Sequence, residues 1–243
     1  MTDRIINFYE ELKLNKNKKP KNWKHHHIEH NSHILCIGAT GTGKSNTLMN
    51  YILRSKGEFK KIIIFSGSTT DEPLYKVLKE SNNKIEFYND IEEMPSLEEY
   101  EETNMEKNKK LIIWDDWINL TSKELKKIFK FIVSSRKYGC GNWLMAQSYT
   151  SVPKIITRNV NYIILFRIND NISINNILKN HNILNVDKDL FKRAYILSTY
   201  EPLNFLLLDF KSRDEKDRVR YNFLNYLDLQ PRENRLMLEN DEK

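Results

Sequence analysis

The sequence lacks any apolar run long enough to cross a membrane, and it contains only two cysteines among 243 residues. A membrane span needs about 20 apolar residues, and the first residues, MTDRIINFYEELKL, are too polar for a secretory signal. Cys36 and Cys140 lie far apart and form no CxxC pair of the kind that binds zinc or carries out redox chemistry. We therefore expect a soluble, intracellular protein with free thiols and no membrane span.

The chain also lacks a strong charge of one sign. Its 39 Lys and Arg are nearly balanced by 33 Asp and Glu, which leaves a net charge of +6. A charge this modest permits nucleic-acid binding without requiring it. A hydrophobic content of 40% is ordinary for a soluble protein, and this length allows one well-buried core. The composition indicates one globular domain and leaves its function open.

Charged residues concentrate near the two ends of the chain. Residues 13–24 hold six lysines and no acid, which is typical of a solvated arm or of a tail that contacts phosphates. The next segment, HHHIEHNSH, holds five of the six histidines, which either lie exposed in a loop or bind a metal. After Arg213 the chain is mostly charged, which indicates a surface helix and a frayed tail. We predict a basic, His-rich arm at 1–32, a core domain at 33–211 and a charged C-terminal helix or tail at 212–243.

Short apolar segments alternate with helical patterns between these ends, which favours an α/β domain with a mainly parallel sheet. Most of the segments are continuously apolar, as expected for strands that are covered on both faces. Thr121 and Glu124 form a capping-box pattern ahead of apolar residues with helical spacing, which predicts a helix over 121–135. The acidic stretch 92–106 is only weakly periodic and indicates a solvated helix or loop. The predicted strands are 33–38, 60–67, 84–88, 110–115, 142–147, 161–167 and 204–210.

The strongest motif is GATGTGKS at residues 38–45, which fits the phosphate-binding pattern G-x-x-x-x-G-K-[ST]. An apolar segment precedes it, and SNTLMNYIL follows with helical spacing. The glycines allow consecutive N–H groups to turn toward one anion, and the helix N-terminus adds a partial positive charge. Lys44 would reach the β- and γ-phosphates, and the Ser45 hydroxyl would coordinate Mg²⁺. The expected nucleotide-binding residues are Gly38, Ala39, Thr40, Gly41, Thr42, Gly43, Lys44 and Ser45.

Two adjacent acids, Asp115 and Asp116, follow the apolar segment LIIW. By themselves they could mark only the point where a strand enters a polar turn. Beside a phosphate-binding loop, however, an acid at the end of a neighbouring strand is needed to hold Mg²⁺, and Asp115 is placed for this role. Asp116 could orient or deprotonate the attacking water. About 70 residues separate Ser45 from Asp115, and no N-K-x-D stretch is present to read guanine, so ATP is the expected nucleotide.

Together with SSRKYGCGNWLMAQSYTSVPKIITRNVNYIILFR, these two motifs resemble the FtsK/HerA superfamily of P-loop motors, and within it the poxvirus-type genome-packaging ATPases of large DNA viruses and virophages. The resemblance spans about residues 33–211 and implies a RecA-like, three-layer α/β sandwich. It places Gln147 near the γ-phosphate, and it implies an arginine that acts on a neighbouring subunit's nucleotide. Arg136 is slightly preferred over Arg158 for that arginine. The superfamily often has Glu where this chain has Asp116, whose shorter side chain must come closer to the water.

The resemblance implies a homo-oligomeric ring that hydrolyses ATP, moves double-stranded DNA without reading its sequence, and packages a viral genome. Capsid or portal-vertex proteins are the implied partners. The implied locations are the viral factory of an infected cell and the virion. The residues themselves leave two alternatives open. A nucleotide or nucleoside kinase shares the P-loop and the α/β pattern, although its lid would have to be the stretch after Arg213. A nucleotide-gated assembly module would bind ATP and capsid proteins with negligible turnover.

Overall fold

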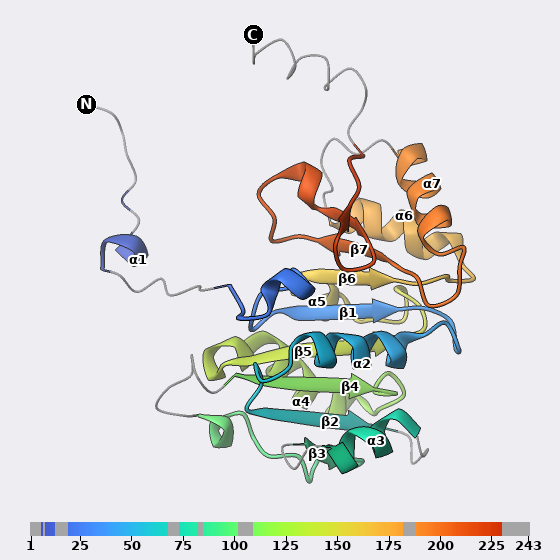
Figure 1. The fold of residues 1–243 in the computed structure, drawn as a ribbon. Helices are drawn as coiled ribbons and strands as arrows, with labels where there is room; N and C mark the ends of the chain where they lie inside the picture. The colour runs from blue at the N-terminus through green and yellow to red at the C-terminus, as the bar shows by residue number, and fades with distance from the viewer. Residues whose placement is uncertain are drawn as a thin grey trace.

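The computed structural model describes residues 6, 8–12, 19–67, 73–81, 85–101, 109–181 and 188–229 (Figure 1). The strands are β1 (His33–Ile37), β2 (Lys61–Ser66), β3 (Ile85–Tyr88), β4 (Lys110–Asp115), β5 (Cys140–Ala146), β6 (Tyr162–Leu165), β7 (Leu206–Asp209), β8 (Val219–Tyr221) and β9 (Asn225–Tyr226). The α-helices are α1 (Phe8–Glu11), α2 (Lys44–Arg54), α3 (Pro73–Ser81), α4 (Ser122–Ser134), α5 (Lys154–Thr157), α6 (Asn171–Asn180) and α7 (Lys188–Ser198). The 3₁₀ helices are η1 (Trp23–His25), η2 (Glu98–Tyr100), η3 (Ser135–Tyr138) and η4 (Glu215–Asp217).

One sheet of nine strands runs through the described residues in the order β3-β2-β4-β5-β1-β6-β7-β8-β9. The strands from β3 to β6 are parallel, and each later strand pairs antiparallel with its neighbour. Parallel strands need long crossover connections, and the helices in these crossovers cover both faces of the sheet. In Figure 1, α2 lies in front of the sheet and α4 lies behind it. The predicted three-layer α/β fold with a mainly parallel sheet is confirmed.

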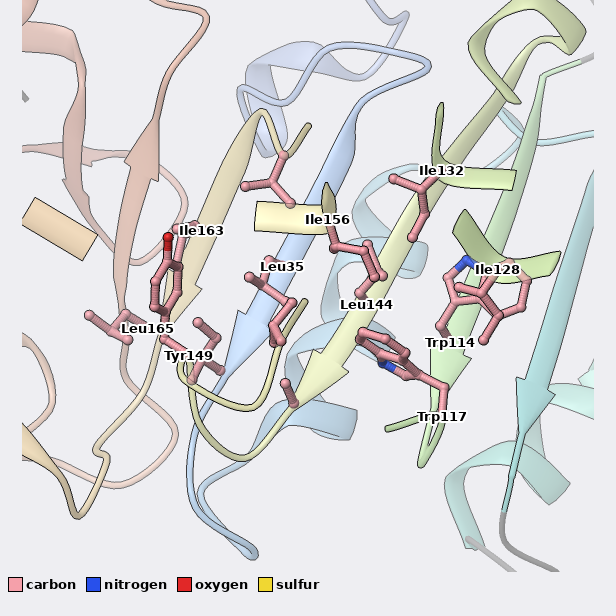
Figure 2. Packing of buried hydrophobic residues seen from close by; sticks show 14 of the residues in the cluster. Leu35, Trp114, Trp117, Ile128, Ile132, Leu144, Tyr149, Ile156, Ile163 and Leu165 are labelled. Carbon is pink, nitrogen blue, oxygen red and sulfur yellow. The ribbon is translucent and has the colours of Figure 1, made fainter. Parts of the chain in front are cut away.

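All seven strands expected from the sequence are present, each within two residues of its expected ends. They are continuously apolar because alternate residues enter two cores, one on each face of the sheet. On β1, Leu35 belongs to one core and Cys36 to the other. Figure 2 shows the first core, where Leu35 and Leu144 of the sheet pack with Ile156 of α5. Both cysteines of the chain are buried free thiols.

The helix expected over 121–135 is α4, and its N-terminus is capped as the sequence indicates. The Thr121 side chain accepts a hydrogen bond from the backbone N–H of Glu124, and the Glu124 carboxylate accepts one from the backbone N–H of Thr121. These two bonds satisfy donors that the first turn of a helix leaves free. Ile128 and Ile132 are buried on the inner side of α4.

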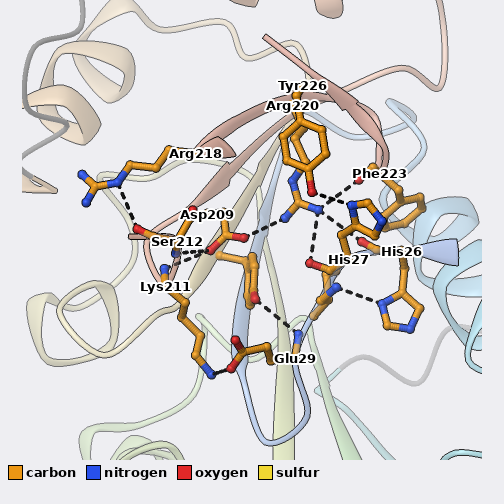
Figure 3. A network of polar contacts seen from close by, with 12 residues as sticks. His26, His27, Glu29, Asp209, Lys211, Ser212, Arg218, Arg220, Phe223 and Tyr226 are labelled. Atoms are coloured by element: carbon orange, nitrogen blue, oxygen red, sulfur yellow. Dashed lines mark hydrogen bonds and ion pairs between the residues drawn. The ribbon is translucent and has the colours of Figure 1, made fainter. Parts of the chain in front are cut away.

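The prediction of a surface helix after Arg213 is wrong within the described residues. The segment forms η4 and then β8 and β9. Strand β8 pairs antiparallel with β7, and β9 pairs antiparallel with β8. Arg220 on β8 is fully buried, and its guanidinium pairs with Asp209 on β7 at 3.0 Å (Figure 3). Strands as short as these depend on pairing with a neighbouring strand, β8 with β7 and β9 with β8, and the local charge gives no sign of that pairing. The last residues, 230–243, lie outside the described part of the chain.

The segment just before β1 packs against the domain, so this part of the expected N-terminal arm is not free in solution. His26 and Ile28 are completely buried. The Arg220 guanidinium donates to the backbone carbonyls of His26 at 3.4 Å and His27 at 3.2 Å, so the β8 strand holds this segment in place (Figure 3). The histidines of the segment are therefore not uniformly exposed. Residues 13–18, which hold three of the six lysines, lie outside the described part of the chain.

The acidic stretch 92–106 is less solvated than its sequence suggests. Met94, Leu97 and Tyr100 are buried and join the core on the α4 side of the sheet. The backbone forms turns and η2 rather than a long helix, and residues 102–106 lie outside the described part. Three apolar side chains anchor a segment whose charged residues remain at the surface. Among the described residues, no helix is both long and apolar enough to span a membrane.

Candidate nucleotide-binding site

The phosphate-binding loop joins β1 to α2 at the carboxyl edge of the sheet. Gly41 and Gly43 adopt positive φ angles of 78° and 107°, which side chains with a Cβ atom rarely tolerate. Gly38 must also be glycine, because a Cβ there would lie 2.5 Å from Thr42 Oγ1 and 2.6 Å from Phe166 Cβ. The expected strand, glycine-rich turn and helix are all present, with α2 beginning at Lys44.

Lys44 folds back over this loop. Its Nζ donates hydrogen bonds to the carbonyl oxygens of Gly38 at 2.8 Å and of Ala39 at 3.0 Å. The ammonium therefore lies over the phosphate-binding loop. When a nucleotide binds, the ammonium could donate its hydrogen bonds to phosphate oxygens in place of these two carbonyl oxygens. This arrangement fits the role that the sequence predicts for Lys44.

Asp115 ends β4, two strands away from β1 in the sheet, so its carboxylate reaches the same carboxyl edge as the loop. Its Oδ2 accepts a hydrogen bond from the Tyr75 hydroxyl at 2.8 Å, and its Oδ1 accepts one from the backbone N–H of Asp116 at 3.0 Å. Burial raises the pKa of the Asp115 carboxyl, the Tyr75 hydrogen bond opposes that rise, and the Asp116 charge adds to it. A bound cation would stabilise the charged form of this half-buried carboxylate.

Asp116 is exposed and sits in a tightly held turn. Its φ angle is +47°, in the left-handed region that non-glycine residues rarely adopt. Gly67, at the end of β2, permits this turn, because a Cβ at Gly67 would lie 2.4 Å from the Asp116 carbonyl oxygen. On the other side, the buried Trp117 donates its indole N–H to the Met145 carbonyl oxygen at 2.9 Å. The acid pair is thereby fixed beside the end of β5.

A cleft of about 780 Å³ lies between the phosphate-binding loop, the acid pair and the end of β5. This volume is within the range of small-molecule sites. The cleft brings together most of the predicted site residues, including Gln147, which is exposed just after β5. Its lining includes Thr40, Gly41, Gly43, Lys44, Ser45, Asp115, Asp116 and Gln147. The Ser45 hydroxyl and the Asp115 carboxylate are oxygen ligands of the kind that Mg²⁺ prefers, so the residues present fit that ion.

The two candidate arginines lie elsewhere. Arg136 is in η3, just before β5 begins, and Arg158 caps α5 before β6 begins, and both are exposed. Both therefore lie at the amino edge of the parallel strands, opposite the cleft. The neighbourhood of Arg136 agrees with this placement, since burial and then the Arg136 charge lower the pKa of His33, the first residue of β1, to about 4. Neither arginine reaches the cleft of its own chain.

Sequence reasoning missed two polar residues near the site. Tyr75 comes from α3, and no local pattern connects it to Asp115, since the contact depends on how α3 packs on the sheet. Arg167 follows β6 at the carboxyl edge, and its backbone carbonyl accepts a hydrogen bond from the Ala39 N–H at 3.2 Å. The signal for Arg167 was available, because it directly ends the predicted strand 161–167 and its side chain is exposed.

A glycine-rich loop between a strand and a helix, with an acid pair at the end of a neighbouring core strand, defines a P-loop ATPase. The chain belongs to the poxvirus A32 protein family, whose model matches residues 21–209. This match confirms the resemblance to the poxvirus-type ATPases that the motifs carry.

Solved structures share the fold. The genome packaging NTPase B204 from Sulfolobus turreted icosahedral virus 2, in complex with AMPPCP, is 14% identical with a TM-score of 0.54, over 80% of this chain and 98% of that chain. The DNA-packaging ATPase B204 from Sulfolobus turreted icosahedral virus is 16% identical with a TM-score of 0.55, over 80% and 98%. The Thermomonospora curvata type VII secretion ATPase EccC matches in its cytoplasmic domain at 16% identity and a TM-score of 0.53, over 81% and 25%. Comparison with curated proteins gave no match.

Proposed function

We propose that this chain is an ATP-hydrolysing motor that moves double-stranded DNA and packages a viral genome into a capsid. The observation that carries the proposal is the single cleft in which Lys44, the acid pair and Gln147 meet. Membership of the poxvirus A32 protein family supports it, and so does the fold shared with two proteins described as packaging enzymes of a virus.

Each residue of the cleft has a distinct task in this proposal. The backbone N–H groups of residues 38–45 and the Lys44 ammonium bind the phosphates of ATP. Ser45 and Asp115 would hold Mg²⁺, and the ion would supply positive charge that offsets the charge of the phosphates. Asp116 orients the attacking water or accepts its proton. The Gln147 amide can hydrogen-bond both a γ-phosphate oxygen and that water.

We propose further that the motor works as a homo-oligomeric ring. Arg136 lies at the edge of the sheet opposite its own cleft, so it can act only on the nucleotide of a neighbouring subunit. Arg158 lies at the same edge and is the second candidate. A guanidinium supplied across the interface would make hydrolysis depend on assembly.

The proposed partners follow from the work of such a motor. Basic residues that line the ring would contact the phosphates of double-stranded DNA and would not read its sequence. Capsid or portal-vertex proteins would receive the ring. The motor would act in the viral factory of an infected cell and could remain with the virion.

The decisive experiment measures phosphate release by the full chain with and without duplex DNA of several unrelated sequences. Hydrolysis should rise when any of these duplexes is added, and electron microscopy of the same sample should show rings. The Lys44→Ala variant controls for a contaminating ATPase. A rate that is indifferent to DNA would contradict the motor. Single-turnover measurements on purified oligomer should show bound ATP being hydrolysed, and negligible hydrolysis would support a nucleotide-gated assembly module.

The described residues after Arg213 do not form the lid that the kinase alternative needs. The stretch after Arg213, which would have served as a lid, forms η4, β8 and β9 at the end of the sheet remote from the acid pair. Transfer of phosphate from ATP to an added nucleoside monophosphate would nevertheless favour a kinase over the motor, so both products should be assayed.

A further inference from the structure

A loop with the sequence TYEPLN, which carries exposed apolar side chains and one acid, Glu201, lies beside the phosphate-binding loop, on the side away from the acid pair. This loop, residues 199–204, connects α7 with the segment that leads into β7. Leu203 packs directly against Gly43, because a Cβ on Gly43 would lie 2.7 Å from Leu203 Cδ2 and 3.4 Å from Leu203 Cα. Figure 1 shows the segment after α7 coming down beside the turn between β1 and α2. The two loops therefore share one surface.

The side chains of this loop are unusually exposed for apolar residues. Leu203 is 51% exposed although it contacts Gly43, and Tyr200 is 74% exposed. Leu197, in the last turn of α7, is 76% exposed. Single exposed apolar residues are common, but here Leu203 contacts the phosphate-binding loop, and Tyr200 and Leu197 precede it by three and six residues. Such a group of exposed apolar residues indicates a surface that another molecule covers.

The backbone of the loop is held in an uncommon conformation. Leu203 has a φ angle of +67°, which is unfavourable for a residue with a Cβ atom and persists only where neighbouring structure enforces it. Asn222, in the turn after β8, supplies that support. Its Oδ1 accepts a hydrogen bond from the Phe205 N–H at 3.1 Å, and its Nδ2 donates to Asn204 Oδ1 at 2.9 Å. Leu203 is thereby kept against Gly43.

The order of the strands decides which part of a nucleotide would meet this loop. Asp115 on β4 and Gln147 after β5 lie on one side of β1, whereas β6 and β7 lie on the other. A triphosphate in the phosphate-binding loop directs its γ-phosphate toward the acid that holds Mg²⁺. The α-phosphate and the nucleoside must therefore leave toward β6 and β7, where residues 199–204 lie.

We propose that residues 199–204 form the base subsite of the nucleotide, in which Tyr200 and Leu203 cover the apolar face of the purine ring. Aromatic and aliphatic side chains bind a base by stacking and dispersion, and Tyr200 offers a ring for this contact. The subsite rests on the proposed function to the extent that the cleft must bind ATP. The subsite would contact the nucleoside, whereas the phosphate-binding loop contacts the phosphates. A change in the subsite should therefore alter affinity for the nucleoside without altering affinity for the phosphates.

The test compares ATP with inorganic tripolyphosphate, which carries a similar phosphate chain without a nucleoside. Dissociation constants of both ligands are measured with Mg²⁺ by calorimetry on the full chain. Tyr200→Ala should weaken ATP binding about tenfold, because stacking of an aromatic ring on one base is worth about that factor. Leu203→Asn should also weaken ATP binding, because it removes the aliphatic contact with the base. Both variants should leave tripolyphosphate binding unchanged. Asn tolerates the positive φ of Leu203, so that variant should fold.

Two further variants serve as controls. Tyr200→Phe keeps the ring and should bind ATP as the unaltered chain does. Leu53→Ala removes a leucine that is more exposed than Leu203, at 69%, from the far end of α2, and it should change neither constant. Photo-crosslinking with 8-azido-ATP should label the peptide that contains residues 199–204.

The inference would be overturned in three ways. Equal weakening of ATP and tripolyphosphate would mean that the loop only supports Gly43. Unchanged ATP binding with loss of oligomers would make the patch an interface between copies of this chain. Label elsewhere in the chain would place the base at another site. If the base contacts are found but hydrolysis ignores DNA, the motor fails and the base subsite stands.

Discussion

The carboxyl edge of the sheet differs on the two sides of β1. Toward β4 and β5 it presents the polar residues Asp115, Asp116 and Gln147, and the acid pair is held by hydrogen bonds to Asp115 and by the buried Trp117. Toward β6 and β7 it presents Leu203 and its exposed apolar neighbours. Breaking the γ-phosphate bond needs precisely placed charge and a water molecule, whereas holding a base needs a flat apolar contact. The phosphate-binding loop follows β1, and β1 lies between the polar side and the apolar side of this edge. One loop can therefore present the phosphates to the polar side and the base to the apolar side.

The largest expected effect comes from Asp116→Asn on the polar side. The amide keeps the size of the side chain but cannot accept a proton, so kcat should fall at least about 100-fold. The ATP dissociation constant should stay within about twofold, because Asp116 acts on water in this scheme. Phosphate release and calorimetry check the two values, with Asp90→Asn, an exposed aspartate outside the cleft, as the control.

Lys44→Ala should have the next largest effect, at the loop that both sides share. It removes a charged contact to the phosphates, so ATP and tripolyphosphate should both bind about 10- to 100-fold more weakly. Lys56→Ala, an exposed lysine beyond the end of α2, should leave both constants unchanged. Equal loss of ATP binding in Lys44→Ala and Asp116→Asn would contradict the assignment of phosphate binding to Lys44 and of water activation to Asp116.

Tyr75→Phe should have a moderate effect that is confined to the polar side. It removes the hydrogen bond that orients Asp115, so the Mg²⁺ concentration for half-maximal nucleotide binding should rise about three- to tenfold. The matched control is Tyr88→Phe, whose hydroxyl bonds Glu86 at 3.3 Å outside the cleft. A Mg²⁺ titration that is identical in the two variants would show that Tyr75 does not position Asp115.

Asn222→Gly should have the smallest effect, on the apolar side. Glycine keeps the positive φ of 55° at this position but removes the side chain that holds the loop. ATP binding should weaken about two- to threefold, within the range of one or two neutral hydrogen bonds, while tripolyphosphate binding stays the same. Asn31→Gly, which has a φ of 54° just before β1, tests the same change at the opposite edge of the sheet. Weaker tripolyphosphate binding by Asn222→Gly would show that the apolar side also affects the phosphates, which would contradict the proposed difference between the two sides.

Local patterns predicted the parts of this protein whose cause is local. The glycine-rich loop is recognisable because its turn needs glycine at Gly38, Gly41 and Gly43, and the capping box at Thr121 predicts where α4 begins. Continuous apolar segments predicted seven strands, because strands that are buried on both faces need no alternation. The pairing of β8 with β7 could not be predicted in this way, since the buried charge of Arg220 is stabilised by Asp209 and by backbone carbonyls of His26 and His27.

The sequence by itself determined the class of fold, the phosphate-binding loop and the acids that could serve it, because glycine turns, helix caps and apolar strands follow from short-range steric and hydrophobic effects. Only the tertiary structure decided that Tyr75 holds Asp115, that Arg136 lies opposite its own cleft, and that Leu203 packs on Gly43. These relations join residues that are far apart in the chain, and the order of the strands in the sheet sets which of them meet.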